Sequence, residues 1–307
     1  MSSPASTAPA RDPRDYQIAA LALFLFWGVT RIGFEVGPAQ IAVTLGSAQL
    51  AQWACARAWR VPPPAPVFGV ALPWDPKSAL ISSLSLCLLL RTNHLALAAL
   101  ASALAVTSKF LVRVRGKHVF NPANGALALL LALRAPVWVS PGQWGQTALV
   151  GFAVACAGAV VVTRAARWDV TFAFLAAWCV VLFGRAAWLG QPWAAPLHQL
   201  SNGALMLFAF FMISDPRTTP DSRAGRLVFA VLVALGTGLV QFVLYRTNGL
   251  LWSLATFSLL VPLIDRVLPG SRYQWSAVTN GALPKGASHE GPRLAVRPAA
   301  AGVRARA

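Results

Sequence analysis

Long apolar stretches follow one another along most of the chain, separated by short polar connections. Stretches of about 15 to 22 residues that almost lack Asp, Glu, Lys and Arg recur from near the N-terminus onward. About 20 mainly apolar residues in a helix cross a bilayer core. The pattern therefore predicts an all-α integral membrane protein with about ten transmembrane helices. The expected spans are residues 16–34, 36–56, 78–92, 93–112, 121–139, 145–163, 168–188, 196–214, 226–245 and 248–264.

The polar segments between these spans are too short to fold as soluble domains. We therefore expect one membrane domain over residues 16–266. A disordered cytoplasmic N-terminus (1–15) and a disordered, basic cytoplasmic tail (267–307) are expected to flank it. The boundary between the third and fourth spans rests on one polar break, Arg91–His94.

Composition excludes an ordinary soluble domain, because 57% of the residues are hydrophobic and only 11% are charged. The charge is one-sided, since 26 Lys and Arg against 9 Asp and Glu give a formal net charge of +17. In a soluble protein this excess would indicate a nucleic-acid partner. In a chain with predicted spans it indicates membrane topology, so we expect a lipid bilayer as partner and no nucleic acid.

The positive charges alternate between the two sides of the predicted membrane domain. The odd-numbered connections hold one arginine each, and all other Lys and Arg residues lie in the even-numbered connections and at the two ends. Because cytoplasmic loops carry the excess of Lys and Arg, both termini are expected in the cytoplasm. The isolated arginines are Arg31, Arg91, Arg134, Arg185 and Arg246.

Cysteine and histidine give no sign of a metal site. The cysteines lie inside apolar spans without a CxxC pair, and the histidines form no His-x-x-x-His pair. The cysteines are therefore expected to be small buried hydrophobic residues, and we expect neither a metal ligand nor a catalytic residue.

The first polar stretch with candidate chemistry runs from Lys109 to Asn124, between the fourth and fifth spans. It ends in Asn121-Pro122, which favours a helix start because Asn caps helices and Pro fits the first helical position. The free N–H groups of that helix point toward the cations before it. The stretch indicates an anion site on the cytoplasmic side, suited to a phosphate, a pyrophosphate or an electron-rich ring.

In such a site Phe120 is expected to stack on a ring, while Lys109, Arg113, Lys117 and His118 supply positive charge. The alternative is a loop that only fixes topology and contacts anionic lipid headgroups.

The second polar stretch, residues 210–221, leaves the eighth span on the same side. Its Asp-Pro and Thr-Pro pairs predict a rigid, extended or turning segment. Asp215, with Thr218, is a candidate to close the site by pairing with a cation of the first stretch or by contacting a sodium ion or a cofactor hydroxyl. A plain loop is the alternative.

The letters Asn-Gly-Ala-Leu begin at Asn124 in the fifth span and at Asn202 in the eighth. Helix starts that enter from opposite faces would fit an inverted repeat. The same letters recur at Asn280 in the polar tail, so the repeat stays one possible architecture among others.

The two polar stretches resemble the membrane subunits NqrB, of the sodium-pumping NADH:quinone oxidoreductase, and RnfD, of the Rnf ferredoxin:NAD complex. The matching words are Gly116-Lys117-His118-x-Phe120-Asn121-Pro122-Ala123 and Phe210-Phe211-Met212-x-x-Asp215-Pro216-x-Thr218-x-Pro220. The resemblance implies a bacterial inner-membrane subunit of an ion-translocating electron transport system, with other subunits as partners. It also implies electron relay through a flavin or a quinone.

The family attaches FMN to a threonine in a Ser-Gly-Ala-Thr type motif, which this chain lacks. In the corresponding connection Ser140 and Thr147 stand in a different context, so covalent FMN is not expected. The resemblance leaves a non-covalent flavin, FMN or riboflavin, near the cytoplasmic side. It also fits a stand-alone homologue of the kind found near enediyne biosynthesis genes.

Two other functions stay open from the residues alone. A transporter or channel without a redox role would use the helix starts as an anion or small-solute site. A scaffold subunit would anchor partners through its basic face. As an enzyme, the chain would be one subunit of a redox-driven ion translocase and not catalytic alone.

Overall fold

The structure is a computed structural model, and it describes residues 12–64, 72–139, 157–163 and 165–273. This part of the chain is mostly helical, as predicted. Residues 157–163 are also helical. The labelled helices are α1 (Pro13–Trp27), α2 (Pro38–Ala58), α3 (Pro76–Leu89), α4 (Leu95–Leu111), α5 (Pro122–Ala132), α7 (Trp168–Trp188), α8 (Ala194–Leu200), α9 (Gly203–Leu207), α10 (Arg223–Gly238), α11 (Gly249–Ser258) and α12 (Val261–Val267).

Three helices continue into single π-helical segments: α1 into η1 (Gly28–Ile32), α9 into η3 (Phe208–Met212) and α10 into η4 (Leu239–Val243). Four short strands form two antiparallel pairs. Strands β1 (Leu90–Thr92) and β4 (Val137–Val139) pair with Arg91 opposite Trp138. Strands β2 (Arg113–Val114) and β3 (Lys117–His118) form a hairpin with Arg113 opposite His118. Gly116 closes that hairpin at φ +76°, a left-handed conformation that glycine adopts without strain.

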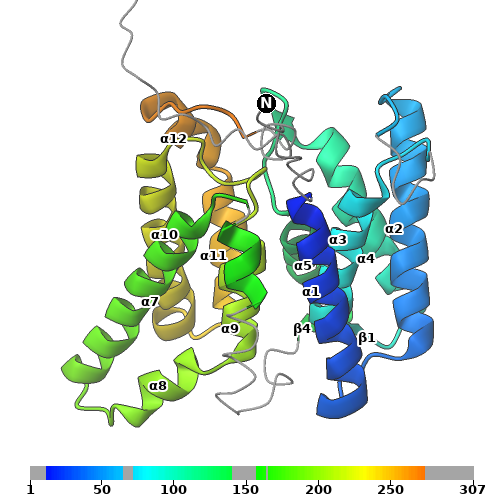
Figure 1. The fold of residues 1–307 in the computed structure, drawn as a ribbon. Helices are drawn as coiled ribbons and strands as arrows, with labels where there is room; N and C mark the ends of the chain where they lie inside the picture. The colour runs from blue at the N-terminus through cyan, green and yellow to red at the C-terminus, as the bar shows by residue number, and fades with distance from the viewer. Residues whose placement is uncertain (1–11, 65–71, 140–156, 164, 274–307) are drawn as a thin grey trace, which may run out of the picture.

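The helices form two groups that lie side by side (Figure 1). One group contains α1 to α5, in which α2 packs on α3 and α4, and α1 packs on α3. The other contains α7 to α12, in which α10 packs on α7 and α11. Contacts between α5 and α11 join the two groups.

The phenylalanines of η3 fill the space between the groups. Phe211 meets Phe24 of α1 edge to face at 5.9 Å between ring centroids, and Phe208 packs on Phe174 of α7 at 5.2 Å. The Oγ1 of Thr171 donates a hydrogen bond to the Ala209 carbonyl at 2.8 Å. Aromatic pairs of this geometry add stabilisation beyond the area they bury. The sequence motif Phe210-Phe211-Met212 is therefore first of all a packing element.

The number of transmembrane helices is not confirmed. Two described helices are long and apolar enough to cross a membrane, α7 and the continuous helix Arg223–Val243. A third candidate is α11 with α12, which bend by 51° where they meet. Other apolar helices are shorter, among them α3, α4 and α5. The sixth predicted span lies largely outside the described residues.

Local breaks explain why the helices are shorter than the apolar windows. The chain becomes extended at β1 after α3, which confirms the break expected at Arg91–His94. The fifth window ends as a helix at Ala132, and Arg134 follows at φ 54°. The eighth window is divided at Asn202, whose Oδ1 accepts the Ala204 N–H at 2.8 Å and caps α9. Hydrophobic windows contain no direct signal for such breaks, because the residues on both sides are apolar.

Tryptophans mark both ends of α7. Trp168 and Trp188 are 48% and 85% exposed, and they begin and end the 21-residue helix. At 1.5 Å per residue they lie about 30 Å apart along the axis. This is about the thickness of the bilayer hydrocarbon core, whose two interfaces favour Trp. The length of α7 thus agrees with a membrane span.

The described charges are divided between two ends of the molecule. The start of α1, the β2–β3 hairpin, the connection 213–222 and α12 gather at one end, which we call the basic end (Figure 1). An Arg272 guanidinium hydrogen bond to the Arg115 carbonyl places the end of the described chain there too. The β1–β4 pair and α8 lie at the opposite end. Both termini of the described chain are therefore on one side, as the charge pattern predicts.

Candidate functional site

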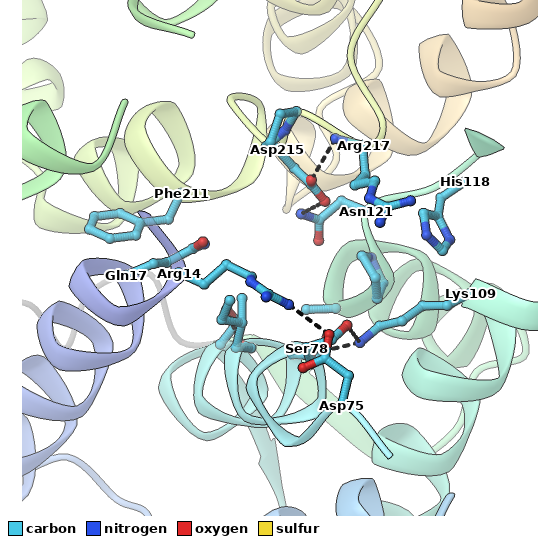
Figure 2. A pocket seen from close by; sticks show the side chains of 16 residues that line it. Arg14, Gln17, Asp75, Ser78, Lys109, His118, Asn121, Phe211, Asp215 and Arg217 are labelled. Atoms are coloured by element: carbon cyan, nitrogen blue, oxygen red, sulfur yellow. Dashed lines mark hydrogen bonds and ion pairs between the residues drawn. The ribbon is translucent and has the colours of Figure 1, made fainter. Parts of the chain in front are cut away.

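A polar cavity of about 110 Å³ lies at the basic end. It is built from the starts of α1, α3 and α5, the end of α4, strand β3 and the connection after η3, and Figure 2 shows its polar side chains converging. Five residues singled out from the sequence line it, and these are Lys109, His118, Asn121, Pro122 and Asp215. The lining residues that the sequence analysis did not identify include Arg14, Gln17, Asp75, Ser78, Ser82, Ser85, Phe211 and Arg217.

Asn121 links the two polar stretches. Its Oδ1 accepts the Asn124 N–H at 3.2 Å and so caps α5, as expected from the Asn-Pro start. Its Nδ2 donates to the Met212 carbonyl at 3.4 Å and lies 3.5 Å from Oδ2 of Asp215. The cap that begins α5 therefore also fixes the position of the Asp215 loop.

Asp215 faces the polar cavity from the connection after η3 (Figure 2). Its Oδ1 accepts the Arg217 N–H at 3.0 Å, and within the described residues it forms no ion pair with a cation of the first stretch. Burial raises its pKa above the usual range of a carboxyl, and the Arg217 N–H and the nearby charges partly oppose that shift. Its carboxylate is thus held by neutral donors.

Lys109 lies at the other wall of the cavity and is 6% exposed. Its Nζ donates to the Ser78 carbonyl at 2.7 Å and to Ser78 Oγ at 3.0 Å. Beside it, Arg14 of α1 forms an ion pair with Asp75 at 2.6 Å. The charge of Lys109 is therefore solvated by neutral oxygens, whereas the charge of Arg14 is balanced by a carboxylate.

Lys117 does not line the polar cavity. Its Nζ forms ion pairs with Asp221 at 2.9 Å and with Asp265 of α12 at 2.8 Å. These three side chains line a separate surface pocket of about 280 Å³, which also includes Arg115 and Arg272. The lysine therefore fixes the β2–β3 hairpin to α12 and to the connection before α10.

His118 lines both the polar cavity and this surface pocket. Its Nδ1 is buried and has no hydrogen-bond partner within the described residues. Burial lowers the pKa of His118 from 6.5 to about 3, with further lowering from three neighbouring cations, Arg113, Arg217 and Lys109. The imidazole is neutral at physiological pH and forms the wall between the two spaces.

The remaining residues singled out from the sequence lie around the cavity without lining it. Arg113 stacks over Phe110 at 5.3 Å, and its Nε donates to the Lys109 carbonyl. Phe120 lies against Gly125, where an added Cβ would be 3.0 Å from the Phe120 Cβ. Asn124 is fully buried and donates from Nδ2 to the Leu251 carbonyl at 3.2 Å. Thr218 donates to the Asp215 carbonyl at 3.3 Å.

A second, large cavity of about 830 Å³ lies at the opposite end of α5. Aromatic side chains line it, together with polar groups from the ends of α8, η4 and α11. Gln241 donates to Gln199 at 3.3 Å on its wall. The aromatic and polar lining residues are Trp138, Trp178, Phe208, Tyr245, Gln199, Asn202, Gln241, Arg246, Thr247 and Asn248.

The two cavities differ in whether a redox ring fits them. Small-molecule pockets typically begin at about 300 Å³, so the 110 Å³ polar cavity is too small to enclose a flavin or a quinone. The large cavity has the volume and the mixture of aromatic and polar groups that such a ring needs. The anion-site character of the basic end therefore does not bring a ring site with it.

No sequence signal identified the large cavity, because its walls come from several separate segments that are mostly apolar or neutral. Arg14 and Asp75 gave only a weak signal, since each stands beside an apolar window that begins with Pro or Asp-Pro. Arg217 lies inside the second polar stretch, and its position two residues after Asp215 was the available clue.

Comparison with known proteins adds a family to this geometry. Residues 135–274 match the model of the NQR2, RnfD, RnfE family. This range contains Asp215, Arg217, Thr218 and most of the large cavity, whereas the stretch Lys109–Asn124 precedes it.

The curated relatives are named as the RnfD-type component of an ion-translocating oxidoreductase complex. The relative from Cronobacter sakazakii is 33% identical over 156 residues, which cover 49% of this chain and 41% of the relative. The relative from Erwinia tasmaniensis is 35% identical over 105 residues, which cover 34% of this chain and 29% of the relative. The one from Mannheimia succiniciproducens is 36% identical over 104 residues, with 34% and 29% covered.

The chain thus spans less than half the length of the curated relatives it matches. The relatives are, by name, components of a multi-subunit complex. The resemblance recognised from the two polar stretches is confirmed by these matches, and residues 135–274 of the chain belong to the NQR2, RnfD, RnfE family.

Proposed function

We propose that this chain is a bacterial inner-membrane subunit of an RnfD/NqrB-like ion-translocating electron transport system, and that it relays electrons through a non-covalently bound flavin or quinone. The family match supports the first part, because the relatives are named as subunits of an ion-translocating oxidoreductase complex. The observation that carries the second part is the 830 Å³ cavity lined by Trp138, Trp178 and Tyr245.

The residues of the large cavity suit a redox-active ring. Trp178 is 3% exposed and stacks on Phe242 at 6.1 Å with ring planes 6° apart, so its position is fixed before a ligand binds. The amides of Asn202, Gln199 and Gln241 offer donors and acceptors for ring nitrogens and oxygens. A flavin or quinone bound there would supply the electron-accepting chemistry, while these residues orient it and exclude water.

The positions of the charges support the proposed orientation. The basic end carries most of the described cations, and the positive-inside rule places it in the cytoplasm. The large cavity then opens toward the opposite membrane face. The proposed ring site is therefore not on the cytoplasmic side that the sequence motif suggested.

A spectrum of the protein purified in mild detergent tests the redox role. We expect flavin absorbance that moves to the supernatant after acid precipitation, or a quinone that organic solvent extracts. Protein that contains neither, and that binds neither FMN, riboflavin nor a soluble quinone on titration, would contradict the proposal.

A substitution that fills the cavity tests where the ring binds. Leu250 lines the large cavity and is partly exposed, so Leu250→Trp is expected to weaken ring binding about tenfold or more by occupying the space. The matched control is Leu235→Trp on α10, where the leucine is 55% exposed and lines no described cavity. Equal binding by both variants would place the ring elsewhere.

A solute transporter is the second candidate, and the interrupted helices favour it. The chain breaks between α8 and α9 at the Asn202 cap and between α11 and α12 at a 51° bend. Discontinuous helices are typical of substrate sites in transporters. Solute flux into proteoliposomes that contain flavin-free protein would support this alternative, whereas dependence of all activity on a bound ring would exclude it.

A further inference from the structure

We propose that the basic end holds a tetrahedral oxyanion, a phosphate or sulfate group, between Arg217, Arg113, Lys109 and His118. This site is independent of the proposed redox ring and lies at the other end of α5. The chemistry is shared by a free inorganic anion and by the phosphate of a lipid headgroup.

The charges around the polar cavity do not balance without such an anion. Arg14 and Asp75 neutralise one another at 2.6 Å. The lining then retains Lys109 and Arg217 against the single carboxylate of Asp215. None of the ion pairs in the described part of the chain includes Lys109, Arg113 or Arg217. A second anion inside the cavity would supply the missing counter-charge.

The cations also oppose one another. Arg217 points across the mouth of the cavity toward His118 (Figure 2). The pKa of the Arg113 guanidinium is lowered by burial and by the charge of Arg217, which shows that the two arginines face one another closely enough to repel. Like charges held together without a counter-ion are unfavourable, and an oxyanion between them converts the repulsion into charge-assisted hydrogen bonds.

The size of the cavity selects a small oxyanion. Its 110 Å³ exceeds the share of one water molecule, about 30 Å³, and falls short of the roughly 300 Å³ of small-molecule pockets. The donors in reach of the space are side chains of arginine and lysine together with neutral polar groups of Asn121, Ser82 and Gln17. A group of five heavy atoms with oxygen acceptors on all sides fits this donor set.

Anion binding is expected to take up a proton at His118. The groups that face its imidazole are Arg113 opposite it in the hairpin, Lys109 on α4 and Arg217 on the connection after η3. Asp215 lines the same cavity, while Lys117 is already paired with Asp221 and Asp265. Neutralising the cations removes part of the field that disfavours imidazolium. The free Nδ1 then becomes a further donor to the anion.

The test uses the full chain in delipidated detergent micelles, with sulfate as the probe because sulfate itself does not titrate near neutral pH. Calorimetric titration of sulfate is expected to show one saturable site. Native mass spectrometry of the same preparation counts retained phospholipid. Sulfate binding identifies a free anion as ligand, and a retained phospholipid that displaces sulfate identifies the headgroup.

The decisive variant is Arg217→Gln, because Arg217 is exposed on a connection and its loss does not remove a buried contact. We expect about tenfold weaker sulfate binding or loss of the retained lipid, since a hydrogen bond to a charged group contributes about 1.5 to 3 kcal/mol. The control is Arg223→Gln, an exposed arginine of the same end that stacks over Trp168 at 5.6 Å. Its effect is expected to stay within about twofold.

Proton uptake gives a separate readout. At pH 5, titrations in two buffers of different ionisation enthalpy are expected to show proton uptake by wild type and none by His118→Gln. The proposal is overturned if neither sulfate nor phospholipid binds saturably, or if Arg217→Gln and Arg223→Gln weaken binding equally.

Discussion

The two cavities at the ends of α5 show how differently one helical scaffold builds its sites. The polar cavity is small, and ion pairs, an asparagine cap and a buried lysine hold its walls. The large cavity has more than seven times the volume, and aromatic side chains and uncharged amides form much of its walls. Charge density therefore marks the site of an ion, while volume and aromatic surface mark the site of a ring.

This difference also separates the sources of stability at the two ends. At the basic end, Arg226 of α10 binds Asp169 of α7 with three hydrogen bonds of 2.6 to 3.0 Å, and both side chains are less than a tenth exposed. At the opposite end, Arg185 donates to Gln191 at 3.0 Å and stacks over Phe242 at 4.4 Å. Buried charges depend on their partners, whereas charges near the surface are solvated when a partner is lost.

The largest expected effect comes from breaking the buried pair. Asp169→Ala leaves the Arg226 guanidinium buried without its carboxylate and is expected to lower the free energy of unfolding by about 3 to 5 kcal/mol. Arg185→Ala at the opposite end is expected to lower it by about 1 kcal/mol or less. Denaturant unfolding in detergent micelles measures both values, and equal losses would erase the contrast between the ends.

An intermediate effect is expected from acid. His118 has a pKa of about 3 in the folded protein against 6.5 when unfolded, so the unfolded state binds more protons between these values. Its contribution to stability is complete above pH 6.5 and is lost as the pH falls toward 3. From pH 6.5 to pH 4.5 wild type should lose about 2 kcal/mol more than His118→Gln.

The control for this pH series is His198→Gln, which removes an imidazole from the opposite end. Thermal unfolding at each pH is the measurement. A pH dependence of His118→Gln identical to that of wild type would show that the basic end does not suppress the protonation of His118.

The smallest expected effect compares the two asparagine caps. Asn121→Ala removes the α5 cap and the contacts to the Met212 carbonyl and Asp215, so about 2 kcal/mol is expected. Asn202→Ala removes one capping bond to the Ala204 N–H, so about 1 kcal/mol is expected. The difference between their unfolding free energies measures the link between the two polar stretches, and a larger loss for Asn202→Ala would contradict that link.

The fold was predictable where local chemistry is strong. Apolar windows indicated helices, and Asn121-Pro122 gave the start of α5 to the residue. The division of the eighth window was not foreseen, because Asn202 reads as one polar residue inside an apolar stretch. The letters Asn-Gly-Ala-Leu also differ in structure, since Asn202 is a cap and Asn124 lies in the first turn of α5.

The basic cavity was partly predictable for the same reason. Its candidates came from two short stretches of chain, and the structure brings Lys109, His118, Asn121 and Asp215 together. Arg14 and Asp75 join them from α1 and the start of α3, and only tertiary packing decides that placement. Lys117 belongs to the same stretch but turns to Asp221 and Asp265, because alternate residues of a strand point to opposite sides.

The tryptophan-marked helix α7 makes the protein sensitive to lipid acyl-chain length. A bilayer thicker or thinner than its 21 residues creates a hydrophobic mismatch, which a helix relieves by changing its tilt. Because α7 packs on α10 and Trp178 stacks on Phe242, a change of tilt also moves the wall of the large cavity. Acyl-chain length therefore acts on the proposed ring site without any contact between lipid and ring.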